Sequence, residues 1–478
     1  MTTARRRWLL GVCLAFVLMP RGTAAQESQI AAEFRKEGEH LRESCTSVKA
    51  LMSCALAVVT GHPLHLALGS LAPQSGFALG AAFSTSHSPN ETWRLSWSGD
   101  GVRSFNGSWR TGAYMKLVHI PEQTITVLAP GAPPPASGTL AVRPSTVFNI
   151  YAQAISLQNV SFYGIGADSP VDDQQTFGMR HTVIGGNVIA PVANSGIARR
   201  MNITLLAEVN GRFVAIRDGV ADGVRTMSRL APGAIPGLND QPDYLQLGEG
   251  VRLKPSLIDG HLQLNYVINF QQFVASGSSH SSFQRWRVDL AHEIPLYGHS
   301  SPATADSRDS NGPNDCAVGI STSDCPPVSR SRDRRGAISL RATSITSITS
   351  QAADGNAVPF YLQPTLGGSD INGQSTLPAF ADYRFRGPHL LLFQQSIEHS
   401  VWGPLGVWAR LDQGMVSSSR RGIAIARLRK TYSGGVTVRA GGFPMMVLSY
   451  AAGGGEGRHF AATINTSLLG GSSRPALD

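Results

Sequence analysis

The stretch HLQLNYVINFQQFV, residues 261–274, decides the fold class. Polar and apolar side chains alternate along it, and between residues 261 and 271 only Val267 departs from the pattern. The apolar face comprises Leu262, Leu264, Tyr266, Ile268 and Phe270, and the polar face comprises His261, Gln263, Asn265, Asn269 and Gln271. A period of two residues predicts a β-strand with unlike faces.

Similar runs occur on both sides of this stretch, at residues 92–98, 148–154, 204–214, 285–290 and 459–468. Counting them all gives about 16 strand candidates between residues 63 and 469. A soluble sandwich alternates too, so strand length has to decide. Soluble strands average about 5 to 6 residues and bilayer-spanning strands need about 9 to 11. The longer runs and their aromatic ends predict an all-β fold, a transmembrane antiparallel β-barrel of about 16 strands.

The composition excludes two other classes of protein. The chain has 478 residues, of which 42% are hydrophobic and 15% are charged, whereas about 25% are charged in a typical soluble domain. A disordered chain would be rich in charge and poor in aromatic residues. Beyond the N-terminus no apolar run reaches the roughly 18 residues that a spanning helix needs, so a helical membrane protein is not expected.

The N-terminus has the three parts of a secretory signal peptide. Arginines occupy positions 5–7, residues 8–19 are apolar, and residues 23–25 (Thr-Ala-Ala) are small. We predict that residues 1–25 are cleaved and that the mature chain is exported to the outer membrane. Because four arginines and no acids leave, the net charge would fall from +9 to +5, and no nucleic-acid partner is expected. The alternative is a retained anchor, for which the stretch is short.

Four cysteines remain after cleavage, in two pairs whose members lie nine residues apart. Two local bridges, Cys45–Cys54 and Cys316–Cys325, are the simplest of the three possible connectivities, and an oxidising compartment permits them. Free thiols are the alternative. No Cys-x-x-Cys motif or nearby histidine at ligand spacing supports zinc.

Residues 26–62 differ from the rest of the chain. Ile30, Phe34 and Leu41 recur at a helical spacing, and a second helical piece is predicted at residues 47–59. We expect this helical segment to act as a plug in or under the barrel, which would occupy residues 63–478. A small capping hairpin without a further role is the alternative.

Catalytic and cofactor motifs are not found in the sequence. There is no Gly-x-Ser-x-Gly elbow, and Leu296 stands where the second histidine of a zinc-protease motif beginning at His292-Glu293 would be. Residues 306–312 lack the acid spacing of a calcium loop, and the Gly-rich residues 453–457 predict a flexible turn between strands. We therefore expect no catalytic residues, no metal site, no cofactor and no enzyme activity.

The C-terminal third carries a specific series of motifs. In chain order these are LGGSD (366–370), LPAF (377–380), DYRFRGP (382–388), WGPLG (402–406), DQGMV (412–416), YSGGV (432–436) and RAGG (439–442). The series resembles that of the bacterial surface antigen D15 family, the Omp85 outer-membrane barrels that include BamA- and TamA-like proteins. The close match covers residues 366–469.

The resemblance implies a 16-stranded barrel with one loop folded back into its lumen. The residues that match this loop motif are Gly367, Gly368, Phe380, Arg384, Arg386 and Gly387. A buried arginine must be paired, so we expect Arg384 or Arg386 to pair with a lumen acid such as Glu398 or Asp412. The alternative is that both arginines are solvated loop residues.

Three features depart from the family pattern. Pro378-Ala379 stands where the family has Arg-Gly at the loop tip. Only 37 residues separate the predicted signal from Pro63, too few for a periplasmic POTRA module. The chain continues past Phe460, its last aromatic residue, instead of ending on one. We therefore expect a D15-like barrel that lacks POTRA domains.

These observations predict an outer-membrane barrel that acts in protein translocation or membrane insertion. Its partners would be outer-membrane lipid, client proteins and a periplasmic protein with POTRA-like modules. One alternative is a passive or gated pore, which arginines in the lumen would bias toward anions. Another is a structural surface protein that presents its outer loops. We expect the long connections 129–144, 217–243 and 297–335 on the cell exterior.

Overall fold

The computed structural model describes residues 64–90, 92–120, 145–192, 200–220, 223–227, 235–255, 261–277, 279–302, 330–349, 358–402, 405–440 and 443–464. The chain divides into two compact units, Met1–His62 and Pro63–Asp478. The predicted signal peptide, the helical segment 26–62 and both cysteine pairs lie outside the described residues and stay predictions. Within the described ranges, no helix is long and apolar enough to cross a membrane.

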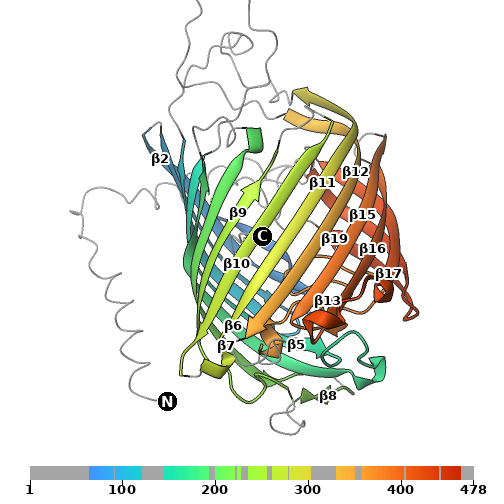
Figure 1. The fold of residues 1–478 in the computed structure, drawn as a ribbon. Coiled ribbons are helices and arrows are strands. Elements are labelled where there is room, and N and C mark those ends of the chain that lie inside the picture. Colours follow the sequence, from blue (N-terminus) through green and yellow to red (C-terminus); the bar gives the residue numbers. More distant parts are fainter. Residues whose placement is uncertain are drawn as a thin grey trace, which may run out of the picture. The chain divides into compact units, whose positions relative to one another are not determined.

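The second unit is one large sheet (Figure 1). Its main strands are β1 (Leu64–Ser70), β2 (Phe77–Asn90), β3 (Trp93–Ser104), β4 (Trp109–His119), β5 (Thr146–Phe162), β6 (Gln175–Pro191), β7 (Ile203–Asp218), β9 (Tyr244–Leu253), β10 (Gln263–Ala275), β11 (Phe283–Pro302), β12 (Arg330–Thr349), β15 (His389–Trp402), β16 (Leu405–Ser417), β17 (Arg429–Ala440), β18 (Phe443–Gly453) and β19 (Arg458–Ile464). The short strand β8 (Arg225–Thr226) pairs in parallel with β6, and β13 (Thr365–Leu366) pairs with β14 (Phe385–Arg386) outside the main sheet.

Each main strand pairs in antiparallel fashion with the next main strand along the chain. The sheet has 17 strands, or 16 without the two-residue β8, so the predicted fold class and strand number are confirmed. Among the described residues no pairing joins β1 to β19.

The two faces of the sheet differ as predicted. On β10, Ile268 is 42% exposed, whereas its neighbour Asn269, which points to the opposite face, is 3% exposed. The outer side chains pack across strands, as where the rings of Phe270 and Trp286 lie 4.7 Å apart. Large apolar side chains are exposed on almost every strand, and a water-soluble protein seldom exposes so many. The outer face is therefore suited to lipid.

The sheet curves around a segment of its own chain. The guanidinium of Arg386 lies 6.0 Å from the ring of Phe162 on β5 and 5.9 Å from that of Phe177 on β6. The next residue, Gly387, approaches Ser417 on β16 so closely that a Cβ would lie 2.9 Å from its carbonyl oxygen. In a flat sheet, β6 and β16 would lie roughly 34 Å apart, at about 4.8 Å per strand. Two adjacent residues reach both strands because the sheet wraps around them.

The connections fall at two ends of the sheet, which we name end A and end B. End A holds the connections β1–β2, β3–β4, β5–β6, β7–β9, β10–β11, β12–β15, β16–β17 and β18–β19, and end B holds the remaining ones. In Figure 1, end A is the lower end, near β8 and β13. The strands that flank residues 217–243 thus meet this connection at end A, whereas those that flank residues 129–144 and the β11–β12 connection meet them at end B. The prediction that all three face the cell exterior is wrong, because successive connections of a meander alternate between its ends. Part of 297–335 is also strand rather than loop.

Candidate functional site: the lumen loop

The β12–β15 connection folds back inside the curved sheet. We name its described part, residues 358–388, the lumen loop. Its base is the β13–β14 hairpin, in which Leu366 pairs with Phe385 and Thr365 with Arg386. Gly367 and Gly368 follow with φ of +107° and +49°, and a Cβ at either would collide with residue 384 or 382. Both glycines of the predicted motif are therefore required by backbone geometry.

Arg384 is 2% exposed by its side chain and makes the central contact of the lumen loop. Its Nε donates to Glu456 Oε2 and its Nη2 to Glu456 Oε1, each at 2.7 Å. Its Nη2 also donates to the carbonyl oxygen of Ser169 at 2.8 Å, and its guanidinium lies over the rings of Tyr163 and Phe385. Such a bidentate pair is the strong form of the arginine–carboxylate contact. We name the Arg384–Glu456 pair the latch.

Glu456 lies in the four-residue turn between β18 and β19. This Gly-rich stretch predicted a flexible turn, and Glu456 is not among the predicted site residues. In the structure, Gly453, Gly454, Gly455 and Gly457 all adopt positive φ. A Cβ at Gly454 would collide with the ring of Phe380 on the lumen loop. The turn therefore fits closely over Phe380, which brings Glu456 to Arg384. An acid inside a glycine run was the available signal.

Arg386 is buried among a carbonyl oxygen and three aromatic rings. Its Nη1 donates to the carbonyl oxygen of Phe360 at 2.7 Å, and its guanidinium faces the rings of Phe162, Phe177 and Phe360. Burial lowers the pKa of Arg386 to about 10, so the group stays charged at neutral pH. Its charge is accommodated by aromatic faces and a carbonyl dipole.

The acid that pairs with Arg384 is Glu456, and the expected Asp412 has other partners. Asp412, on β16, accepts from Arg410 Nε at 2.8 Å and from Gln394 Nε2 at 2.9 Å. It reaches the lumen loop indirectly, because Arg410 Nη2 donates to Ser375 Oγ at 2.7 Å. Glu398 lies on β15, opposite Trp408 and Ala337 in the registers of the two neighbouring strands, and its pairing with a lumen-loop arginine stays a prediction. Glu456 is closer to Arg384 because the β18–β19 turn reaches the same end of the sheet.

Other connections at end A converge on the lumen loop. Arg429 Nη2 donates to the carbonyl oxygen of Ala167 at 2.8 Å, and its guanidinium lies 4.7 Å from the ring of Phe385. Phe360 N donates to the carbonyl oxygen of Pro236 in the β7–β9 connection at 2.9 Å. Segments from across the sheet thus hold the loop, and the idea that its arginines are solvated is wrong.

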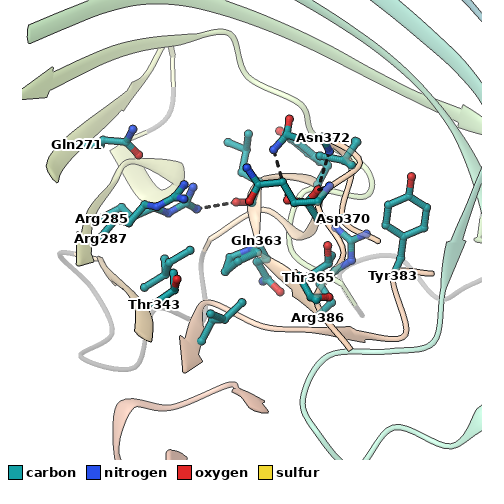
Figure 2. A pocket seen from close by; sticks show the side chains of 18 of the residues that line it. Gln271, Arg285, Arg287, Thr343, Gln363, Thr365, Asp370, Asn372, Tyr383 and Arg386 are labelled. Atoms are coloured by element: carbon teal, nitrogen blue, oxygen red, sulfur yellow. Dashed lines mark hydrogen bonds between the residues drawn. The ribbon is translucent and has the colours of Figure 1, made fainter. Parts of the chain in front are cut away.

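A cavity of about 550 Å³ lies between the lumen loop and the wall of the sheet. Figure 2 shows Arg285 and Arg287 reaching from one strand toward the loop, with Gln363, Asp370 and Arg386 on the other side. Its charged lining is mostly arginine: Arg212, Arg285, Arg287, Arg341, Arg386 and Arg410, with Glu208 and Asp370. Burial raises the pKa of Asp370, although backbone amides of Asn372 and Gln374 donate to it.

Metal ligands do not gather in the described part of the chain. No group of three or more His, Cys, Asp or Glu side chains there could hold a metal ion. His292 and Glu293 are neighbours on β11, so they point to opposite faces of the sheet and form no common site.

Comparison with known proteins gives structural neighbours only. No family model and no curated protein matches the chain. The chain is similar to BamA from Haemophilus ducreyi lacking POTRA domains 1–3, with 11% identity and a TM-score of 0.44, over 84% of this chain and 69% of that one. It is also similar to CdiB from Acinetobacter baumannii and from Escherichia coli, each at 11% identity over 84% of this chain, with TM-scores of 0.42 and 0.44. It spans 59% and 61% of those two chains.

Proposed function

We propose that the chain is an outer-membrane β-barrel of the D15/Omp85 type that acts in protein translocation or membrane insertion and is held closed at end A by the lumen loop. The observation that carries the proposal is the latch, a buried ion pair that fastens this loop inside the curved sheet. Outer-membrane lipid, client proteins and a periplasmic partner with POTRA-like modules are the partners proposed.

The dimensions of the strands support a position in the bilayer. Fourteen of the sixteen main strands run for 10 to 20 residues, and a tilted strand needs about 9 to 11 to cross. Their outward side chains are apolar. Their inward side chains form polar contacts across strands, as where Glu208 Oε1 accepts from Gln246 at 2.6 Å and from Gln271 at 2.9 Å. Lipid outside and polar groups inside is the pattern of a transmembrane barrel.

The latch also supports a role that involves movement. Glu456 belongs to the last hairpin of the sheet, β18–β19, so the lumen loop is fastened to the C-terminal edge. The two terminal strands, β1 and β19, have seven residues each and are the shortest main strands. Edge strands are the place where an extended client segment can add to a sheet. Release of the latch would free the loop and this hairpin together.

The test uses two single substitutions, a charge-reversed double variant and a control. Arg384→Ala and Glu456→Gln each remove one half of the latch, which we expect to lower the stability of the closed state by about 3 kcal/mol. In planar bilayers, both variants should show larger and more frequent conductance steps than the wild type. The charge-reversed Arg384→Glu/Glu456→Arg protein should return toward wild-type behaviour. Arg110→Ala is the control, because Arg110 on β4 forms an ion pair with Asp100 on β3, away from the lumen loop.

Insertion is measured separately, in proteoliposomes. We expect liposomes that hold the chain to fold an added unfolded barrel protein faster than empty liposomes do, and Arg384→Ala to change that rate. Equal rates with and without the chain would contradict a role in insertion. An unboiled gel confirms that each variant has folded.

A gated pore is the second candidate, and the arginine-rich lining of the cavity favours it. Discrete, anion-biased conductance steps from the wild-type protein, without any effect on client folding, would select the pore. A structural surface role is the third. Loss of adhesion after deletion of residues 303–329, which separate β11 from β12, with the barrel intact, would select it and would place end B outside the cell.

A further inference from the structure

Two exposed arginines lie close together on the outer face of the sheet, toward end A. Arg180 is on β6 and Arg217 is on β7, which are neighbouring strands. Each alternates with outward side chains of its own strand, such as Ile184, 54% exposed, and Phe213, 42% exposed. Within the described part of the chain, neither arginine makes an ion pair. The outer face therefore presents two positive charges here.

The side chain of Arg217 is held in place across a glycine. Gly178 lies opposite Arg217 in the β6–β7 register, and a Cβ there would lie 2.7 Å from both Cγ and Nε of Arg217. Beyond Gly178, Arg217 reaches β5, where its Nη2 donates to Ser156 Oγ at 2.7 Å and to the carbonyl oxygen of Leu157 at 3.2 Å. An arginine has donors on three nitrogens. Because these contacts use only Nη2, the fixed guanidinium can still donate to a ligand.

The contact with Ser156 brings this guanidinium next to Arg180. Ser156 lies directly opposite Arg180 in the β5–β6 register, and the Cα atoms of such a pair are about 4.5–5.5 Å apart. The charged group of Arg217 therefore lies beside the point where the side chain of Arg180 leaves β6. Like charges on neighbouring strands repel each other. An oxyanion bound between the two guanidinium groups would offset this repulsion.

Both arginines lie where the apolar outer band of their strands ends. From Arg180 toward end B, the outward positions of β6 carry no formal charge; they are Thr182, Ile184, Gly186, Val188 and Ala190. From Arg180 to Ala190 the strand extends about 34 Å, or about 26 Å across a bilayer at a tilt of about 40°, which matches an apolar band of about 25 Å. Trp109, opposite Ser156 in the β4–β5 register, adds a ring typical of the membrane interface. The pair therefore lies at the level of lipid headgroups.

We propose that Arg180 and Arg217 bind the phosphate of an anionic lipid in the leaflet at end A. Planar guanidinium groups match the geometry of phosphate oxygens, and Ser156 fixes the position of one of them. Other exposed cations lie on the outer face near end A, namely Arg103 on β3, Lys430 on β17 and Arg458 on β19. The inference rests on the membrane position proposed above, and it does not depend on translocation or insertion.

Native mass spectrometry tests the site on the full mature chain, folded in detergent micelles with equal amounts of phosphatidylglycerol and phosphatidylcholine of the same acyl length. Both lipids contain a phosphate, and only the first has a net negative charge. We expect the wild type to retain phosphatidylglycerol in preference to phosphatidylcholine, and Arg180→Gln to lower this preference about fivefold. Arg110→Gln is the matched control and should keep the preference. Arg110 follows Trp109 on β4 but pairs with Asp100, so the same charge is removed away from the proposed site.

Equal retention of the two lipids by the wild type would overturn the proposal, as would an unchanged preference in Arg180→Gln or an equal loss in Arg110→Gln. If Arg180→Gln fails the unboiled-gel test of folding, Arg217→Gln takes its place with the same expectation. A preference for phosphatidylglycerol together with a negative client-folding assay would reject the role in insertion and leave the lipid site in place. Client folding without a lipid preference would do the reverse.

Discussion

At Gly454 the chain passes so close to Phe380 that only a glycine fits. A Cβ there would collide with the ring, whereas a Cβ at Gly455 meets no atom within 4 Å, and φ is +71° and +79° at the two positions. A comparison of alanine substitutions at Gly454 and Gly455 therefore separates the effect of a steric collision from that of backbone strain. This matters for function because the same turn carries Glu456 to the latch.

We predict that Gly454→Ala destabilises the folded barrel by about 1–3 kcal/mol more than Gly455→Ala does, because both suffer the backbone strain and only the first overpacks Phe380. Denaturant unfolding followed on unboiled gels measures the difference. In a Phe380→Ala background, Gly454→Ala should cost no more than Gly455→Ala does, because the ring that it overpacks is gone. Equal destabilisation by the two glycine substitutions would show that the turn does not pack on the lumen loop.

Within one strand, the face on which a residue lies determines how much an introduced charge destabilises the folded barrel. Ile268 is an outward residue of β10, and Asn265 on the same strand points inward and lines a second cavity with Glu293 and Arg341. The outward side chain meets lipid in the proposed membrane position, whereas the inward one meets polar groups.

We predict that Ile268→Arg lowers the free energy of unfolding in lipid by about 2–4 kcal/mol, the cost of an arginine on the lipid face near the middle of a bilayer. Asn265→Arg should cost less than half as much. Reversible unfolding from phospholipid vesicles compares the two variants. A larger loss from Asn265→Arg would mean that the faces are assigned the wrong way round.

For the whole molecule, connection length distinguishes the two ends. Three connections at end B, 91–92, 403–404 and 441–442, have only two residues, whereas the shortest at end A have four. Short turns are typical of the periplasmic side of such barrels. End A, which the lumen loop closes, is therefore expected to face the cell exterior.

We predict that a membrane-impermeant maleimide applied to intact cells labels Phe105→Cys and not Trp402→Cys. The native cysteines are replaced by serine in both variants. Phe105 lies in the β3–β4 turn at end A and is 83% exposed, and Trp402 ends β15 at end B and is 72% exposed. Labelling of lysed cells should modify both positions equally. The reverse pattern in intact cells would invert the orientation.

The strands could be predicted from the sequence alone because alternation is a local property. When one face of a strand meets lipid and the other meets a polar lumen, apolar and polar side chains must alternate along that strand, whatever its neighbours are. The run around Ile268 therefore predicted strand, face and class correctly. The lumen-loop residues Arg384 and Arg386 could be identified as well, since their motif resembles that of a known family. Because a buried guanidinium needs partners for its charge, contacts to both arginines could be expected too.

Their partners could not be predicted, since partners depend on how distant segments meet. Glu456 lies 72 residues from Arg384 and reaches it only because the last hairpin and the lumen loop both lie at end A. The expected acid, Asp412, is nearer in sequence but is bound by Arg410 on its own strand. Likewise, the arginines of the cavity come from β7, β11, β12, β14 and β16, and those of distant strands meet only because the sheet curves. Local periodicity decided the strands and their faces, and the curvature of the sheet around the loop decided which charges lie together.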